Sequence, residues 1–150
     1  MKQTKTSKIA LLSILTALSV ALGYVVKIPT ATGILTFLDA GIFFTAFYFG
    51  RREGAIVGGL GGFLIDLISG YPHWMIFSLI FHGSQGYFAG FKGKWQWLGL
   101  VLASLVMVAG YAFATAWMKG WGQALADVPH NLVQNFVGML VGFLLCQSIT

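Results

Sequence analysis

The sequence predicts an all-α integral membrane protein, a bundle of six transmembrane helices that forms a single membrane domain over residues 1–150. Hydrophobic residues make up 57% of the chain and charged residues only 9%, with a formal net charge of +5. A soluble domain of this length would need many more charges on its surface. The basic residues stand beside apolar runs, where they are typical of orientation signals. We therefore expect the lipid bilayer, and no nucleic acid, as a partner.

Two adjacent arginines, Arg51 and Arg52, divide a long apolar stretch into two pieces that are each just able to cross a bilayer. A re-entrant hairpin is the alternative, but it would place both arginines and Glu53 in hydrocarbon, at about 2.5 to 3.5 kcal/mol per charge. Two spanning helices with a tight cytoplasmic turn are therefore expected. With four further apolar runs they give six predicted helices, over residues 9–26, 38–50, 54–69, 74–91, 95–118 and 128–146.

Local signals support the helix ends. The run at 9–26 lacks a small-residue cleavage pattern, which disfavours a cleaved signal peptide. The Gly-Tyr-Pro turn at 70–72 ends the third helix and starts the fourth. Asp127 followed by Pro129 is typical of a helix start, with a capping carboxylate before a proline in the first turn, so the sixth helix is predicted to begin there. Asp39 is interpreted in the same way, as the N-cap of the second helix.

The basic residues also predict the orientation. If the N-terminus is cytoplasmic, seven lysines and arginines lie inside and only two lie outside. By the positive-inside rule, both termini then face the cytoplasm. The inner set is Lys2, Lys5, Lys8, Arg51, Arg52, Lys92 and Lys94, and the outer pair is Lys27 and Lys119.

Small residues recur every four positions in three predicted helices. Such stripes let helix backbones approach closely in lipid, so they are expected to pack within the bundle. The stripes are Gly54, Gly58 and Gly62, then Gly86 and Gly90, then Gly138 and Gly142. A further stripe in the first helix, Ser13, Ala17 and Ala21, has no polar neighbour of obvious chemical use. We interpret it as a face for a partner protein.

Polar side chains inside the apolar runs are few and predict a pocket open to the outside. Three amides share a stripe on the sixth helix, and a hydroxyl, an imidazole and an amide share a face of the fourth. Aromatic residues of the outer connections, including Trp117 and Trp121, lie at the same depth, where aromatic belts are also ordinary. The candidate substrate-binding residues are Asn131, Gln134, Asn135, His130, Ser78, His82, Gln85, Tyr111, Thr115, Tyr71, His73 and Trp74.

Asp66 is the one carboxylate well inside an apolar run, a turn from the outer end of the third helix. A ligand contact or a proton site are two interpretations of such a residue. A bond from its side chain to the backbone of the turn at 70–72 is the more economical one, and we expect it.

Motifs of several other functions are absent from the sequence. It contains no HExxH, no GxSxG, no cysteine pair and no glycine-rich phosphate loop with lysine. A haem held by His82 and His130 is disfavoured because the two residues are predicted at different depths. No channel filter and no inverted repeat is evident. We therefore expect no enzymatic activity, no metal and no cofactor in this chain.

Four segments in chain order resemble one family. They are the Leu-Asp-Ala-Gly start of the second helix at 38–41, the FGRREGA connection at 49–55, DLISGYP at 66–72 and HGSQG at 82–86. In this combination the chain resembles the substrate-binding S component of an energy-coupling factor (ECF) vitamin transporter. The resemblance covers nearly the whole chain. Within the family it is most similar to the group associated with hydroxymethylpyrimidine and vitamin B6 compounds.

The resemblance implies a multi-pass plasma-membrane protein that captures a water-soluble vitamin or its precursor at the outer face. The implied partners are a transmembrane coupling subunit and two cytoplasmic ATPase subunits, which use the ATP. The family's AxxxA surface, used to meet the coupling subunit, is matched by Ala17 and Ala21. The implied ligand site lies between the outer parts of helices four to six, under the connections at 27–37 and 69–73.

One departure from the family concerns the ligand. Where relatives often carry Lys and Glu in the fourth helix, this chain has His82 and Gln85. The difference favours a neutral or weakly basic heterocycle, which can stack on aromatic rings while amides pair with its nitrogens and hydroxyls. An S component for a different vitamin is one alternative. A cofactor-binding membrane subunit that uses His82 and Asp66, or a structural subunit whose polar stripes serve only assembly, are the others.

Overall fold

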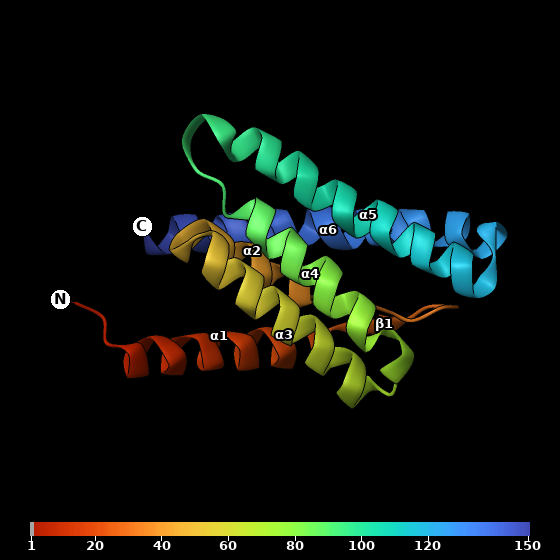
Figure 1. The fold of residues 1–150 in the computed structure, drawn as a ribbon, viewed down its shortest axis with the longest axis horizontal. Helices are drawn as coiled ribbons and strands as arrows, with labels where there is room; N and C mark the ends of the chain where they lie inside the picture. The colour runs from red at the N-terminus through yellow and green to blue at the C-terminus, as the bar shows by residue number, and fades with distance from the viewer. Residues whose placement is uncertain (1) are drawn as a thin grey trace.

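The computed structural model describes residues 2–150, which form one bundle of six helices with a small β hairpin (Figure 1). The helices are α1 (Lys5–Val25), α2 (Leu38–Phe49), α3 (Arg51–Ser69), α4 (Met75–Ala89), α5 (Gln96–Lys119) and α6 (Trp121–Ile149). Strands β1 (Lys27–Pro29) and β2 (Ile34–Thr36) make the hairpin, and short 3-10 turns, η1 (Pro72–Trp74) and η2 (Gly93–Trp95), precede α4 and α5. The all-α membrane class predicted from the sequence is confirmed.

Three helical segments are long and apolar enough to cross a membrane, namely Lys5–Val25, Gly93–Lys119 and Trp121–Ile149. Helix α2 is also apolar but shorter. It is the most buried of the helices because it packs against α1, α3, α4 and α6. Large apolar side chains remain exposed along the outer faces of the bundle, as expected where lipid replaces water. The chain is a multi-pass membrane protein.

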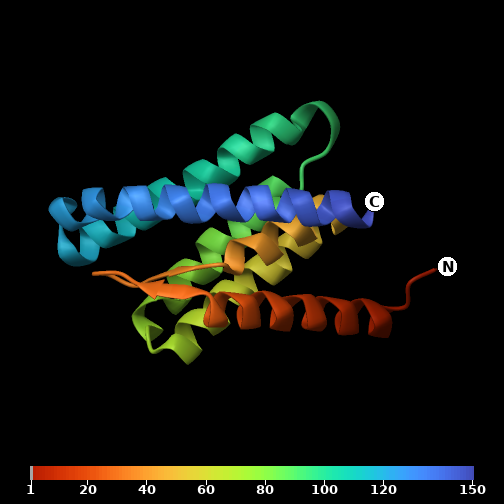
Figure 2. The same cartoon turned by 180° about the vertical axis from the view of Figure 1, so that it is seen from behind.

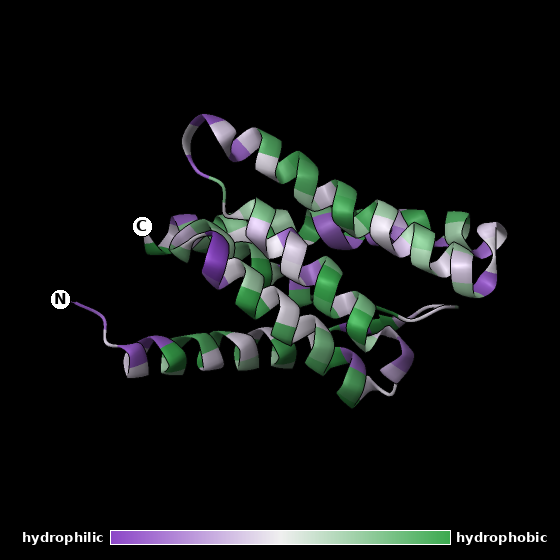
Figure 3. Cartoon of the chain, in the orientation of Figure 1, coloured by the Kyte–Doolittle hydropathy of each residue, from purple (hydrophilic) through white to green (hydrophobic). Residues whose placement is uncertain are grey.

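The connections divide between two ends of the bundle. Figures 1 and 2 show both termini at the same end as the α2–α3 turn and the α4–α5 connection. The hairpin, the α3–α4 turn and the α5–α6 turn lie at the opposite end. Polar residues gather at these ends while the helices between them are mostly apolar (Figure 3). Of the basic residues, the seven predicted as inner belong to segments at the end with the termini, and Lys27 and Lys119 to segments at the other.

Glycines bring α3 and α4 into backbone contact, as the stripe predicted. A Cβ at Gly54 would lie 2.5 Å from the carbonyl oxygen of Gly86, and a Cβ at Gly62 would lie 2.7 Å from that of Ser78. A Cβ at Gly58 would overlap the His82 carbonyl. The glycine stripes of α6 serve the same purpose against α2, where a Cβ at Gly142 would meet the Phe43 Cβ at 2.7 Å. The prediction that these stripes pack within the bundle is confirmed.

The α2–α3 turn is tighter than predicted. Arg51, Arg52 and Glu53 were expected to form a connection before a helix at 54–69, but they are the first turn of α3. Gly50, with φ of 117°, alone separates the two helices. Its positive φ reverses the chain in one residue, a conformation that other residues adopt only at a cost. Glu53 then pairs with Lys8 of α1 at 2.6 Å.

Helix α6 begins at Trp121 and not at 128, so the predicted helix start at Asp127 is wrong. Gly120, with φ of 91°, makes the α5–α6 turn, and Pro129 lies inside the helix. Proline is tolerated within membrane helices because neighbouring groups satisfy the freed carbonyl. The polar residues between 119 and 128 are helical because one face of this segment meets the hairpin, through a bond from Thr32 to Asp127.

The connection at 27–37 folds into a hairpin that the sequence did not predict. Lys27 pairs with Thr36 and Pro29 with Ile34 in an antiparallel register. The backbone N–H of Thr30 donates to the Gly33 carbonyl at 2.9 Å, which closes the turn. The strands are three residues each, too short for sequence alternation to show. The hairpin lies at the end of the bundle opposite the termini (Figure 1).

Candidate functional site

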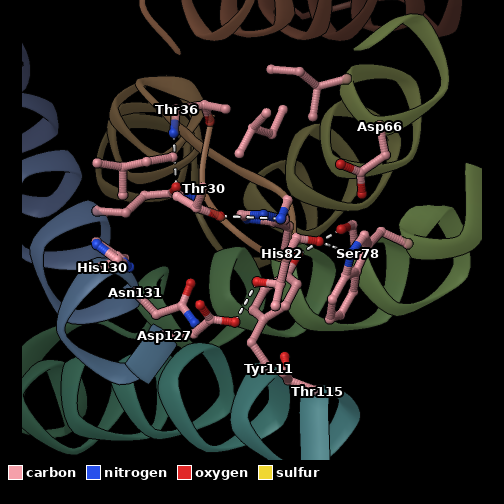
Figure 4. A pocket seen from close by; sticks show the side chains of 17 residues that line it. Thr30, Thr36, Asp66, Ser78, His82, Tyr111, Thr115, Asp127, His130 and Asn131 are labelled. Carbon is pink, nitrogen blue, oxygen red and sulfur yellow. Dashed lines mark hydrogen bonds between the residues drawn. The ribbon is translucent and has the colours of Figure 1, made fainter. Parts of the chain in front are cut away.

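The hairpin covers a cavity between the ends of α3, α4, α5 and α6. Together with the open solvent at its mouth, the space between the lining atoms is about 590 Å³. Figure 4 shows side chains from all these elements pointing into it. The lining residues are Thr30, Thr32, Gly33, Ile34, Leu35, Thr36, Ile65, Asp66, Trp74, Ser78, His82, Tyr111, Thr115, Asp127, His130, Asn131 and Gln134.

Aromatic rings form the α4–α5 wall of the cavity. The Trp74 ring centroid lies 5.4 Å from that of Tyr111, and the His82 centroid lies 5.9 Å from Tyr111. Hydrogen bonds fix these rings, since Trp74 Nε1 donates to the Thr32 carbonyl at 2.8 Å and the hydroxyls of Ser78 and Tyr111 are 2.6 Å apart. This wall offers flat apolar surface with polar tips, which suits a planar heterocycle.

Asp39 is the centre of a buried polar network beneath the cavity. It is fully buried, and its Oδ1 and Oδ2 accept hydrogen bonds from Gln134 Nε2 at 3.0 Å and Gln85 Nε2 at 2.8 Å. His82 Nδ1 lies 3.5 Å from Asp39 Oδ1 and 3.1 Å from Gln85 Oε1. The predicted N-cap role of Asp39 is wrong, because Asp39 is the second residue of α2 and Phe37 precedes the helix without a side-chain cap. The side chain bonds across helices instead.

Two candidate residues lie in this network and do not line the cavity. Gln85 is fully buried and donates also to Asn135 Oδ1 at 3.0 Å. Asn135, fully buried too, donates from Nδ2 to the Ser104 hydroxyl at 2.8 Å. Both amides therefore connect α4, α5 and α6 below the cavity floor. Gln134, the residue before Asn135 on α6, does line the cavity.

The hairpin is tied to α6 at two points. The backbone N–H of Thr36 donates to Gln134 Oε1 at 2.8 Å, and the Thr32 hydroxyl donates to Asp127 Oδ2. Asp127 Oδ1 also accepts a hydrogen bond from Gln123 Nε2 at 3.5 Å. Gln134 thus joins the hairpin to the buried Asp39 network. His130 and Asn131 line the cavity from the same helix.

Asp66 is placed differently from the expectation. The turn at 70–72 is stabilised by the backbone, since the Tyr71 N–H donates to the Asp66 carbonyl oxygen at 2.8 Å. The side chain is 6% exposed and lines the cavity. Its buried Oδ2 accepts no hydrogen bond from any described residue. The predicted bond from this side chain to the turn is therefore wrong.

The structure brings together eight of the twelve candidate residues around the cavity: Trp74, Ser78, His82, Tyr111, Thr115, His130, Asn131 and Gln134. Tyr71 and His73 lie outside its lining, as do Trp117 and Trp121. Trp117 is 80% exposed, as an interfacial residue would be. Sequence reasoning missed the individual hairpin residues and Asp127. The one available signal was the threonine-rich connection between two helix ends, at Thr30, Thr32 and Thr36.

Comparisons with known proteins agree on one family. Residues 3–150 match the family model described as ECF-type riboflavin transporter, S component. The chain is 45% identical to the thiamine precursor transporter HmpT of Lactococcus lactis subsp. cremoris (strain MG1363), over 99% of this chain and 91% of that protein. It is also 37% identical to an uncharacterized protein of Pyrococcus woesei, over 78% of this chain and 82% of that protein. The chain therefore belongs to the S components of energy-coupling factor transporters, the membrane subunits that bind the substrate and have no enzymatic activity.

Proposed function

We propose that this S component captures hydroxymethylpyrimidine, a precursor of thiamine, in the cavity beneath the hairpin. The relative from Lactococcus lactis is a thiamine precursor transporter, and it is similar to this chain over nearly its whole length. The observation that carries the proposal is the cavity itself. One wall is aromatic, at Trp74 and Tyr111, and the opposite helix supplies the amides Asn131 and Gln134. A small aromatic ring with several hydrogen-bonding groups fits this combination.

The test is calorimetric titration of the purified protein in detergent with hydroxymethylpyrimidine, pyridoxine and riboflavin. We expect hydroxymethylpyrimidine to bind most tightly. Pyridoxine is the vitamin B6 alternative, and riboflavin is the vitamin that the matching family model names. Tightest binding of riboflavin, or no binding of the pyrimidine, contradicts the proposal. Mass spectrometry of small molecules that co-purify with the protein is an independent check.

We propose further that the cavity faces the outside and both termini face the cytoplasm. Lysines and arginines concentrate at the end of the bundle with the termini, and the cavity lies at the other end. A membrane-impermeant thiol reagent tests this in intact cells, in a Cys146→Ser background. Gly122→Cys should be labelled and Arg52→Cys should not. The reverse labelling contradicts the orientation.

We propose that the exposed face of α1 meets the transmembrane coupling subunit, which joins the two ATPases that supply the energy. Ser13, Ala17 and Ala21 are exposed on this helix, whereas Thr16, Ser19 and Val20 are buried against the bundle. A face of small residues allows a partner helix to approach closely in lipid.

A further inference from the structure

Three aspartates lie at or beneath the cavity, and they differ in how the protein satisfies them. Both oxygens of Asp39 accept hydrogen bonds, from Gln134 and Gln85. Both oxygens of Asp127 do so as well, from Thr32 and Gln123. Asp66 alone has a buried oxygen, Oδ2, that no donor among residues 2–150 reaches. Asp66 is therefore the cavity carboxylate that retains an unused acceptor.

The backbone around Asp66 explains why the turn needs no hydrogen bond from its side chain. Gly70, with φ of 85°, ends α3 in a left-handed cap, and the Tyr71 N–H satisfies the Asp66 carbonyl. The turn therefore needs nothing from the carboxylate. The side chain points from α3 towards the α4 side of the cavity, where Ser78 and His82 lie (Figure 4).

Within residues 2–150, no lysine, arginine or histidine forms a salt bridge with the Asp66 carboxylate. Among the described residues, Lys8 forms an ion pair with Glu53, and the His82 ring lies 3.5 Å from Asp39 Oδ1. Lys27, at the start of the hairpin, places its Nζ 3.4 Å from the Ser69 hydroxyl. A buried acceptor without a donor is unfavourable, so its presence in a native structure needs an explanation, of which a bound group is one.

On the basis of the proposed function, we propose that Asp66 accepts a hydrogen bond from the exocyclic amino group of the pyrimidine. The amino group of hydroxymethylpyrimidine supplies two N–H donors, and Trp74 and Tyr111 in the wall of the same cavity can contact its ring. A hydrogen-bond acceptor at this position strengthens the binding of a ligand with an amino group there. It weakens the binding of a ring that has an acceptor oxygen at the same place. Asp66 thereby selects aminopyrimidines over heterocycles that carry an oxo group at this position.

The test compares two ligands, hydroxymethylpyrimidine and the same ring with hydrogen in place of the amino group. The wild-type protein should bind the amino ligand about 10- to 100-fold more tightly, the usual effect of one hydrogen bond to a charged group. Asp66→Leu should remove this preference and leave the affinity for the analogue within about twofold. Asp127→Leu is the matched control, and should weaken both ligands equally because it releases the hairpin.

A stability measurement separates a ligand-recognition role from a structural one. Because Asp66 Oδ2 makes no protein hydrogen bond, ligand-free Asp66→Leu should unfold at the wild-type temperature or higher. The inference is overturned if Asp66→Leu keeps the preference for the amino ligand or weakens both ligands equally. If the wild-type protein binds neither pyrimidine, the proposed function fails together with the inference. If it binds them and Asp66→Leu discriminates as before, only the inference fails.

Discussion

Gln134 on α6 donates a 3.0 Å hydrogen bond to Asp39 on α2, and through its other amide atom it accepts the backbone N–H of Thr36 at 2.8 Å. One side chain therefore joins the end of the hairpin to the most buried carboxylate of the bundle. The hairpin that covers the cavity and the polar network below it are therefore connected by hydrogen bonds through this residue.

Gln134→Leu should loosen the hairpin while keeping a side chain of similar size. The loss of two hydrogen bonds should weaken ligand binding by about 10-fold or more, mainly through faster dissociation. Stopped-flow fluorescence of Trp74, which lines the cavity, reports the dissociation rate. Gln147→Leu, an exposed position at the far end of the same helix, is the control and should change neither rate. An unchanged dissociation rate in Gln134→Leu would show that the hairpin does not depend on this bond.

Asp39→Asn should destabilise the protein although the two side chains have the same shape. Both Asp39 oxygens accept from amide donors, so an asparagine must place its own NH₂ against either Gln85 or Gln134. The expected loss in free energy of unfolding is about 1 to 3 kcal/mol. Denaturant titration in detergent measures it. Equal stability of Asp39→Asn and wild type contradicts the role assigned to this network.

Gly58→Ala should separate α3 from α4, because the new Cβ would overlap the backbone carbonyl of His82. A backbone clash cannot be relieved by rotating a side chain, so a destabilisation of about 1 to 3 kcal/mol is expected. Gly122→Ala is the matched control, since no atom lies within 4 Å of a Cβ at this helical position. There alanine should be neutral or stabilising by about 0.5 to 1 kcal/mol. Comparable effects at both positions would refute the close approach of α3 and α4.

Ala17→Trp should abolish ATP-driven uptake and spare ligand binding, because a bulky ring on the exposed face of α1 blocks the coupling subunit. Uptake in cells that express the complete transporter, and calorimetry on the purified subunit, give the two readouts. Leu105→Trp is the control, at a residue 56% exposed on α5, across the bundle from α1 (Figure 1). If Ala17→Trp loses ligand binding while the complex stays intact, the substitution acts on the ligand site and α1 is not the partner face.

The glycine spacing on α3 predicted correctly that this helix packs within the bundle, because a period of four residues maps directly onto one face of a helix. Helix boundaries were less predictable. Asp127 and Pro129 have the chemistry of a helix start, yet both lie inside α6. Contact of Asp127 with the hairpin replaced the local capping role, and only the fold supplies that contact.

The sequence by itself determined the membrane class, the helices and the family, because these depend on composition, on short-range periodicity and on motifs in chain order. It also singled out most of the polar groups that the cavity collects. Tertiary structure alone decided which carboxylate each amide satisfies. Asp39, Asp66 and Asp127 are the same residue type, but hydrogen bonds to the first come from residues 46 and 95 positions away. Helix packing determines which residues pair over such separations. In this packing, Asp66 is the aspartate whose buried Oδ2 has no donor among the described residues.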